Sequence, residues 1–396
     1  MDFSKDWDQN SFTVCRTAER VCRRETKMGI THLSGLEVAG IPTMGTGGLL
    51  PFTGNWYFVD YYRGSDGNTG AADSPLQTLY QAQNLMQDGH NDVALIVPAP
   101  LSTSLSNGTQ RLSLANAQTI NPAATSGTLT WAKNACHIIG LTAPCQTFAR
   151  ARLAPPSGTY TAATFLNGQA AASNPLVNVT AHGCIFHNFT VFGGFSTGNT
   201  SFITWLDSGG ENYYYAVAFQ GQADAASAAG TGTASTSSRT LLITGTSGDN
   251  IFERCTIGTD TVQRVTNATQ TMELAGGTPR NRFIECDFPL DLATAAAGTV
   301  SVYTAGSSSI DRFTKFDRCC FLNASTFSSG VAQTGVVKIG ASAGGQMLFK
   351  DCSFLGATGT FASGDTTTSG QMWVDGGGPV SNATASSTGV PIHPYV

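Results

Sequence analysis

The chain has 396 residues, with 21 lysines and arginines against 26 aspartates and glutamates, a formal net charge of −5. This acidic balance provides no basic stripe to neutralise phosphates, so nucleic acid is not expected as a partner. Only 12% of the residues are charged and 45 are glycines, which argues against long helices and favours many short strands. No apolar stretch approaches the roughly 18 residues of a transmembrane helix, so no membrane span is expected.

The first thirty residues differ from the rest because they hold eleven charged residues. Thr13 to Met28 has apolar residues at roughly helical spacing, which predicts a short amphipathic helix. Residues 29–54 are predicted to be extended, so residues 1–54 form an N-terminal arm. The first eight residues lack the basic and apolar segments of a secretory signal. We therefore expect the ten cysteines to stay reduced during folding.

A strand is predicted over 56–62 and a turn over 63–70. A helix follows, with Ser74 as its N-cap and Pro75 at its first position, and 92–98 is a buried strand. This order resembles the N-terminal cap of right-handed parallel β-helix proteins of the pectate-lyase-like superfamily. In those proteins the helix covers the open end of the core, and the resemblance implies the same here.

The most informative feature is a repeated template of the form F-x-x-C-x-F/I. Its four clear copies begin at Phe252, Phe283, Phe316 and Phe349, and two degenerate copies begin at Phe186 and Tyr214. The cysteines Cys255, Cys286, Cys319 and Cys352 are 31, 33 and 33 residues apart. A coil of this length suits three short strands and three turns, and six copies predict a solenoid.

Equivalent residues of stacked coils form ladders, and the template sets their direction. The four template cysteines and the Phe or Ile two residues later are predicted to point into the core, where the thiols are inert. The residue between them, Thr256, Asp287, Cys320 or Ser353, is predicted to point outward. The residues before the cysteines alternate in sign and predict an ion-pair ladder: Arg254, Glu285, Arg318 and Asp351. Neither the cysteines nor the six scattered histidines have metal-site spacing, so no metal is expected in the repeats.

The predicted fold class is all-β, a right-handed parallel β-helix with an N-terminal capping helix and a short charged arm. Residues 55–135 are assigned to the cap and first coils, 136–375 to the β-helix, and 376–396 to a C-terminal tail. Cys15, Cys22, Cys136 and Cys145 are left unassigned. Residues 225–238, which contain only small and polar side chains, are either an interface or a flexible loop.

Glycoside hydrolysis requires two carboxylates facing one sugar bond. Glu253 with Glu285 or Asp317 is the candidate pair, but arginines in the same ladder are expected to hold these acids ionised. The motifs of the polygalacturonase family are absent. An enzyme is therefore not expected, and no cofactor is assigned.

Two further groups of side chains have a functional and a structural interpretation. Trp205, Tyr213, Tyr214 and Tyr215 form either an aromatic platform for a sugar or part of the core. Asp60, Asp66, Asn68 and Asp73 either bind Ca²⁺ or satisfy a tight turn. In both cases the structural interpretation is preferred.

A β-helix without a secretory signal, with a short charged arm and reduced cysteines, resembles virion proteins of tailed bacteriophages. The resemblance implies a homotrimer that folds in the host cytoplasm and becomes part of the virion. The first hypothesis is a non-enzymatic capsid decoration or cement protein whose arm meets the major capsid protein or another virion protein through Arg16, Arg20, Arg23, Arg24 and Lys27. The alternative is a tailspike or receptor-binding protein that binds or cleaves a surface glycan.

Overall fold

The computed structural model describes residues 54–98, 129–143, 151–154, 175–192, 203–220, 239–245, 248–264, 270–292, 300–304, 309–325, 331–333, 335–339 and 344–357, and short strands at 44–45, 48–49, 112–113 and 372–375. The chain divides into two units, Met1–Phe52 and Thr53–Val396. In the first unit, β1 (Met44–Gly45) pairs antiparallel with β2 (Gly48–Leu49). None of the helices in the described residues is long and apolar enough to cross a bilayer.

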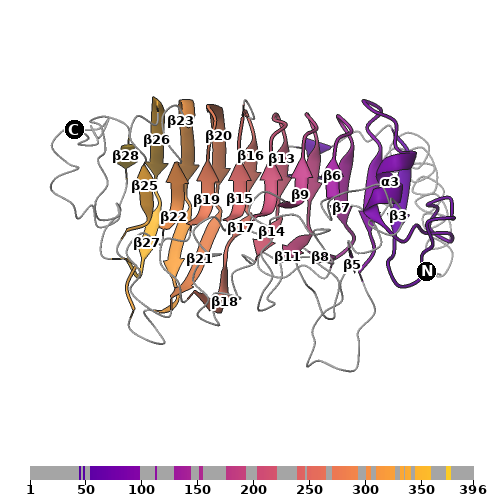
Figure 1. Ribbon diagram of the computed structural model, residues 1–396, viewed down its shortest axis with the longest axis horizontal. Helices are drawn as coiled ribbons and strands as arrows, with labels where there is room; N and C mark the ends of the chain where they lie inside the picture. The colour runs from indigo at the N-terminus through magenta and orange to yellow at the C-terminus, as the bar shows by residue number, and fades with distance from the viewer. Residues whose placement is uncertain are drawn as a thin grey trace, which may run out of the picture. The chain divides into compact units, whose positions relative to one another are not determined.

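The second unit contains three parallel sheets (Figure 1). Sheet 1 has ten strands: β3 (Trp56–Val59), β4 (Val93–Ile96), β7 (His137–Gly140), β10 (Ile185–His187), β13 (Tyr213–Tyr215), β16 (Ile251–Glu253), β20 (Thr278–Ile284), β23 (Ile310–Asp317), β26 (Gly344–Lys350) and β28 (Met372–Asp375). Sheet 2 has β5 (Leu112–Ser113), β8 (Arg152–Ala154), β11 (Thr190–Phe192), β14 (Ala218–Gln220), β17 (Thr256–Ile257), β21 (Asp287–Leu292), β24 (Cys320–Asn323) and β27 (Ser353–Leu355), and β18 (Thr259–Arg264) also pairs with β21. Sheet 3 has β6 (Leu129–Trp131), β9 (Pro175–Val179), β12 (Ile203–Asp207), β15 (Arg239–Ile243), β19 (Gln270–Leu274), β22 (Val300–Thr304) and β25 (Val337–Ile339).

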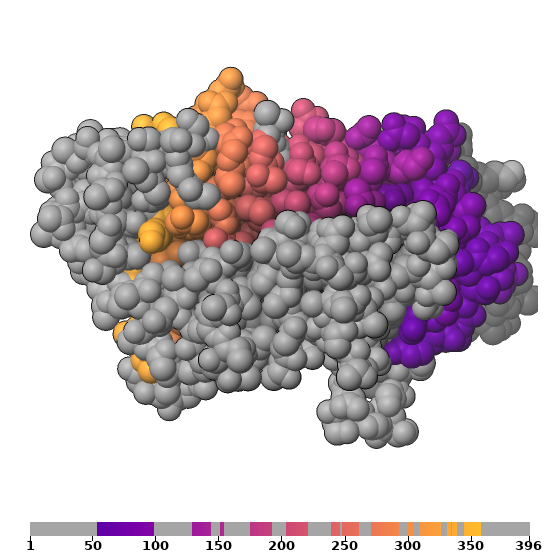
Figure 2. Space-filling view, viewed as in Figure 1, coloured from indigo at the N-terminus to yellow at the C-terminus, as the bar shows by residue number. Residues whose placement is uncertain are grey.

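The chain visits the sheets in a fixed order, so that one coil takes a strand from sheet 3, then sheet 1, then sheet 2. The strands β12, β13 and β14 are one such coil, and β15 begins the next. Figure 2 shows the coils following one another in chain order, from indigo through magenta to orange. This arrangement is a parallel β-helix, and it confirms the predicted fold class.

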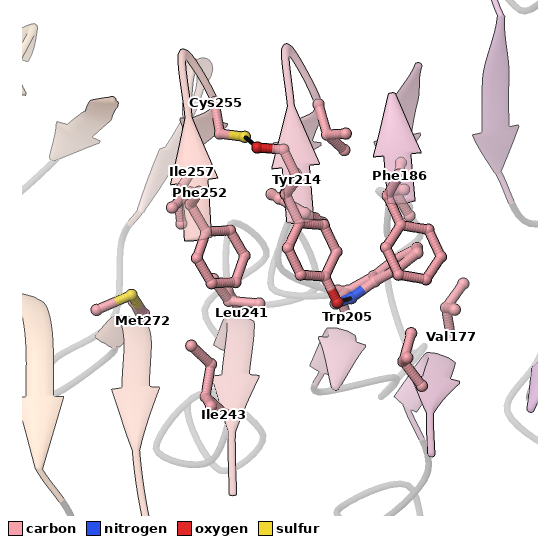
Figure 3. Close-up of a cluster of buried hydrophobic side chains, with 14 of the residues drawn as sticks. Val177, Phe186, Trp205, Tyr214, Leu241, Ile243, Phe252, Cys255, Ile257 and Met272 are labelled. Carbon is pink, nitrogen blue, oxygen red and sulfur yellow. Dashed lines mark hydrogen bonds between the residues drawn. The ribbon is translucent and has the colours of Figure 1, made fainter. Parts of the chain in front are cut away.

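The aromatic residues of the repeat form a continuous column inside sheet 1. Its members are Phe186, Tyr214, Phe252, Phe283, Phe316 and Phe349. Neighbouring ring centroids are 4.4 to 4.8 Å apart and the ring planes differ by 1° to 14°. Figure 3 shows three of these rings side by side. Because the coil spacing of about 4.8 Å matches the stacking distance of aromatic rings, one large side chain per coil fills this part of the core.

The corner between sheets 1 and 2 forms a second column, whose backbone conformation the repeat did not predict. At this corner Asn188, Ala216, Arg254, Glu285, Arg318 and Asp351 all have positive φ angles between 50° and 59°. The left-handed conformation turns the chain sharply, and the next residue of each coil enters the core. Sequence periodicity gives the direction of a side chain but does not report the backbone conformation of a turn.

The N-terminal cap differs from the prediction in two boundaries. Strand β3 ends at Val59, because Asp60 starts a turn in which its carboxylate accepts from the backbone N–H groups of Tyr62 and Arg63. The helix α3 (Leu79–Leu85) begins after Thr78, whose side chain accepts from Gln81 N.

The predicted N-cap at Ser74 is wrong. Ser74 forms a bridge with Ala71, and Leu76 forms one with Val59, so this segment is held extended. Helix α3 packs against β3 and β4 and buries Leu79 and Ala82 in the core.

Candidate functional site

Polar and aromatic side chains gather on the outer face of sheet 1, in two columns on either side of the buried aromatic column. Since strand residues alternate between faces, these columns point away from the core. From β7 to β26, the first column is His137, Ile185, Tyr213, Ile251, Arg282, Lys315 and Leu348, and the second is Ile139, His187, Tyr215, Glu253, Ile284, Asp317 and Lys350. In both columns the aromatic residues lie on the earlier coils and the charged residues on the later coils, with aliphatic residues interspersed.

Two tyrosines form the middle of this face. Tyr213 and Tyr215 lie two residues apart on β13, with ring centroids 6.2 Å apart and planes 27° apart. Both are partly exposed. The Tyr213 hydroxyl donates to Glu253 Oε2 at 2.9 Å, and the Arg254 guanidinium donates to the Tyr215 hydroxyl at 3.3 Å. The rings are thus oriented by neighbours on the next coil.

The aromatic group continues on the preceding strand. The His187 ring lies 5.1 Å from the Tyr215 ring. His187 is buried, and burial lowers its pKa to about 4. At neutral pH this imidazole is therefore uncharged, and it packs beside the Tyr215 ring without adding a charge.

The three predicted catalytic carboxylates lie in this region but do not form a matched pair. Glu253 and Asp317 are in the same outward column, with Ile284 between them. Their backbones are therefore two coils apart, roughly 10 Å at the usual strand spacing. Glu285 lies at the corner of the intervening coil, where its left-handed backbone directs it away from that column.

Arginines on both sides hold Glu285 in an ion-pair ladder. Arg254 Nε lies 3.0 Å from Glu285 Oε2 and an Arg318 nitrogen lies 3.1 Å from Glu285 Oε1. Hydrogen bonds from Arg254 and Arg318 lower the pKa of Glu285. The predicted ladder is thus present over three of its four members, and no ion pair of Asp351 occurs within the described residues.

Asp317 is also held ionised. Burial raises its pKa, but the hydrogen bond from Lys315 and the charges of Lys315, Arg318 and Lys350 outweigh burial, so its pKa is lowered. Lys315 Nζ lies 2.9 Å from Asp317 Oδ2. A general acid needs a raised pKa, and neither Glu285 nor Asp317 has one.

Trp205 and Tyr214 belong to the core and not to the tyrosine face. Both are fully buried, and Trp205 Nε1 donates to the Tyr214 hydroxyl at 3.2 Å (Figure 3). The Tyr214 hydroxyl donates in turn to Asp207 Oδ2 at 2.7 Å. Of the predicted platform, only Tyr213 and Tyr215 are accessible.

This buried network was not predicted. Asp207 is fully buried at an inward position of β12, and it also accepts from Asn212 Nδ2 and Gly209 N. Burial, and then the Asp207 carboxylate, raise the pKa of Tyr214 well above its ordinary value. The available signal was an aspartate at a position of the strand that otherwise faces the core.

The four cysteines of the repeat lie in the core, with at most 2% of each exposed. Each thiol lies near a backbone carbonyl of the preceding coil; Cys286 Sγ, for example, is 3.3 Å from Phe252 O. Burial raises the pKa of Cys286 well above its ordinary value, so it stays protonated. Among the outward residues that follow the cysteines, Thr256 is buried, Asp287 and Cys320 are half-buried and Ser353 is exposed.

The acidic turn of the cap is held by its own hydrogen bonds. Asp66 accepts from the backbone of Gln77 and from the backbone and hydroxyl of Thr78. Asp60 pairs with Arg63 at 3.1 Å, and Asn68 donates to Pro75 O. These contacts fit the turn interpretation, and no group of three or more His, Cys, Asp or Glu suited to a metal occurs in the described part of the chain.

Several predicted residues lie outside the described residues. They are Arg16, Arg20, Arg23, Arg24 and Lys27 of the arm, Cys15, Cys22 and Cys145, and the segment 225–238. Cys136, also unassigned from the sequence, is buried in the core near Gln87 O.

Among known proteins, similar structures exist, but no family model and no curated protein matches this chain. Pectate lyase Pel9A superposes with a TM-score of 0.50 and 14% identity over 82% of this chain and 70% of the lyase. A rhamnogalacturonan lyase gives a TM-score of 0.46 and 15% identity over 81% of this chain and 73% of that protein. The pectin methylesterase from Aspergillus niger gives a TM-score of 0.46 and 14% identity over 88% of this chain and 92% of the esterase.

This chain has the right-handed parallel β-helix fold of the pectate-lyase-like proteins. The fold assignment rests on the likeness to Pel9A, and at 14% identity that likeness extends to the fold alone. Function must therefore be argued from the side chains of sheet 1.

Proposed function

We propose that this chain is a non-enzymatic virion protein that binds a surface polysaccharide through the outer face of sheet 1. Of the two functions predicted from the sequence, this is the alternative, a receptor-binding protein, and it includes binding of the glycan but not cleavage. The observation that supports it most directly is the pair of partly exposed rings, Tyr213 and Tyr215, each joined through its hydroxyl to a charged side chain of the next coil.

Sugar recognition suits this geometry for two reasons. Aromatic faces provide apolar area for the C–H surface of a sugar ring at low entropic cost. Glu253 and Arg254 provide an acceptor and a donor at the edges of the rings, where sugar hydroxyls would lie. The lowered pKa values of Glu285 and Asp317 favour binding without cleavage, since a glycosidase requires a proton donor.

The virion setting is supported by the state of the cysteines. All seven described cysteines are free, and Cys255, Cys286, Cys319 and Cys352 occupy successive coils. Thiols this close together remain free most readily in a protein that folds under reducing conditions. A particle protein assembled in the host cytoplasm meets this condition.

The test is binding of the full chain to a panel of immobilised bacterial surface polysaccharides. The double variant Tyr213→Ala/Tyr215→Ala should lose at least tenfold in affinity for any polysaccharide that the wild type binds. Tyr62→Ala is the matched control, because Tyr62 is an exposed tyrosine on the cap. Equal binding by the double variant would refute the proposal.

Cleavage is tested in the same samples by measuring new reducing ends. We expect none. If reducing ends appear and Glu253→Gln abolishes them, the chain is an enzyme and the non-catalytic part of the proposal is wrong.

A capsid decoration protein is the second candidate. The exposed ladder of Arg254, Glu285 and Arg318 favours it, because mutually neutralised charges suit a structural surface better than a reactive one. Antibody labelling of purified particles separates the two roles, since label over the head indicates decoration and label at the tail tip indicates a receptor-binding protein. Deleting residues 2–28 should abolish attachment in either case, through loss of Arg16, Arg20, Arg23, Arg24 and Lys27.

A further inference from the structure

A cluster of arginines lies on sheet 1 away from the tyrosine pair, at the edge where the chain enters β20 and β23. Arg280 and Arg282 are on β20, and Arg312 is on β23. Lys315 lies beside Arg282 in the register of the two strands. Like charges at paired positions of neighbouring strands repel each other. Lys315 is partly neutralised by its ion pair with Asp317, so an anion bound beside Arg282 would relieve the repulsion that remains.

The arginines differ in how far their charge is already neutralised. Arg280 makes a two-point ion pair with Asp249. Arg312 lies 3.7 Å from Asp311, and both side chains are about 60% exposed, so this contact is weak. Arg282 is exposed, and no ion pair of its guanidinium occurs in the described part of the chain.

The backbone brings Arg312 into this cluster by an irregularity. Strand β23 has one residue more than β20 between the pairs Pro279–Asp311 and Asn281–Thr314, and one more than β26 between Ile310–Gly344 and Phe313–Gln346. The extra residue is a β-bulge around Arg312, whose φ is 75°. Bulges of this kind redirect a side chain and are common beside binding sites, and a left-handed arginine is costly where glycine would serve.

The register of β20 and β23 places Arg312 beside Arg280, and Arg282 lies two residues further along β20. The hydrogen bond from Arg280 lowers the pKa of Asp249, and the charges of Arg280, Arg312 and Arg282 all act on the same carboxylate. Asp249, Asp311 and Asp317 are the acids that pair with this cluster, three negative charges against the four positive charges of Arg280, Arg282, Arg312 and Lys315, so it retains a positive charge.

We propose that Arg282 and Arg312, with Arg280 and Lys315 beside them, form a binding site for an oxyanion group, which is a phosphate, sulfate or carboxylate. Guanidinium groups match these groups because their planar N–H donors bind two oxygens at once. The site lies apart from Tyr213 and Tyr215 and does not rest on polysaccharide binding. It supplies an anion-recognising contact whether the oxyanion is free or is a substituent of a larger ligand.

The test is calorimetric titration of the full chain with sodium phosphate, sodium sulfate and sodium glucuronate. A chloride buffer at constant ionic strength separates site binding from general screening. The wild type should bind at least one probe saturably. Glucuronate binding alone would assign a carboxylate ligand, and phosphate or sulfate binding would assign a tetrahedral oxyanion.

Arg282→Gln and Arg312→Gly should each weaken binding at least tenfold. Glycine at position 312 fits the φ of 75°, so this variant removes the guanidinium while keeping the bulge. Arg63→Gln is the control, because Arg63 is an exposed, ion-paired arginine of the cap. Thermal melting confirms that each variant is folded.

The proposal is overturned if no probe binds the wild type saturably, if both arginine variants bind as well as the wild type, or if Arg63→Gln weakens binding equally. Failure of the polysaccharide proposal would be seen in the polysaccharide-binding assay and is independent of this titration. Tyr213→Ala/Tyr215→Ala should keep oxyanion binding unchanged whatever its effect on glycans.

Discussion

The inside and the outside of sheet 1 are made by the same strands, yet they differ in how their columns are composed. Inside, one aromatic ring per coil repeats from Phe186 to Phe349 with nearly constant spacing. Outside, aromatic residues lie on the earlier coils and charged residues on the later coils, with aliphatic residues interspersed. Core packing therefore requires the same kind of residue in each coil of the interior, whereas residues of the outer face can differ between coils and can bind a ligand.

Removing one ring from the aromatic column of the interior should cause the largest loss of stability. Phe283 lies between Phe252 and Phe316 and is fully buried, so Phe283→Ala should lower the free energy of unfolding by about 3–5 kcal/mol. Urea denaturation measures the loss. Tyr62→Ala removes a ring that is 49% exposed and should change stability by about 0.5 kcal/mol or less. Equal effects would show that the stack does not dominate the core.

The outer face should be sensitive to acid at its two buried histidines, His137 and His187. Burial lowers the pKa of His137 and of His187 to about 4, whereas an unfolded histidine titrates near 6.5. The unfolded chain then binds more protons than the folded chain between these values, so stability falls as pH falls through this window. From pH 7 to pH 5 the expected loss is about 2 kcal/mol for each histidine.

Urea denaturation at pH 7 and at pH 5 tests this dependence. His187→Gln should remove about half of the loss that the two histidines cause. Carboxylates with lowered pKa values, such as Asp317, titrate below pH 5 and do not contribute to the difference in stability between pH 7 and pH 5. A stability that is flat from pH 7 to pH 5 would contradict the burial of these rings.

The interior also contains one polar network, and breaking it should cost less than removing a ring. Tyr214→Phe keeps the stacked ring but leaves Asp207 without its hydroxyl donor and Trp205 Nε1 without its acceptor. The expected loss is about 1–3 kcal/mol, measured by urea denaturation. Tyr213→Phe, on the outer face, removes a hydroxyl that solvent can replace and should be close to neutral. A neutral Tyr214→Phe would mean that the network adds no stability.

The fold was more predictable than the site because it depends on a periodic signal. The F-x-x-C-x-F/I template placed Phe252 and its equivalents, and Cys255 and its equivalents, in their columns. Helix α3 begins later than predicted because Ser74 is held by a bridge to Ala71 that no local rule reveals. Asp207 and the bulge at Arg312 depend on contacts with neighbouring coils, which a single repeat does not encode.

The corner between sheets 1 and 2 should give the smallest effect, and one of opposite sign. Ala216 has a φ of 50°, and an L-residue in this conformation costs roughly 1–2 kcal/mol relative to its favoured one. Glycine avoids that cost but gives up about 0.4–1 kcal/mol through the greater freedom of the unfolded chain. Ala216→Gly should therefore stabilise the protein by about 0.5–1 kcal/mol, measured as a higher urea midpoint with an unchanged slope.

Ala218→Gly is the matched control, since Ala218 lies two residues later in β14 and is also buried, without a positive φ. There glycine brings the entropic cost and no relief of strain, so this variant should be less stable than the wild type. If both variants are destabilised alike, the corner residues are not strained. In that case the turn between sheets 1 and 2 is maintained without conformational cost, and the same conclusion extends to Arg254, Glu285 and Arg318, which have the same left-handed backbone at this corner.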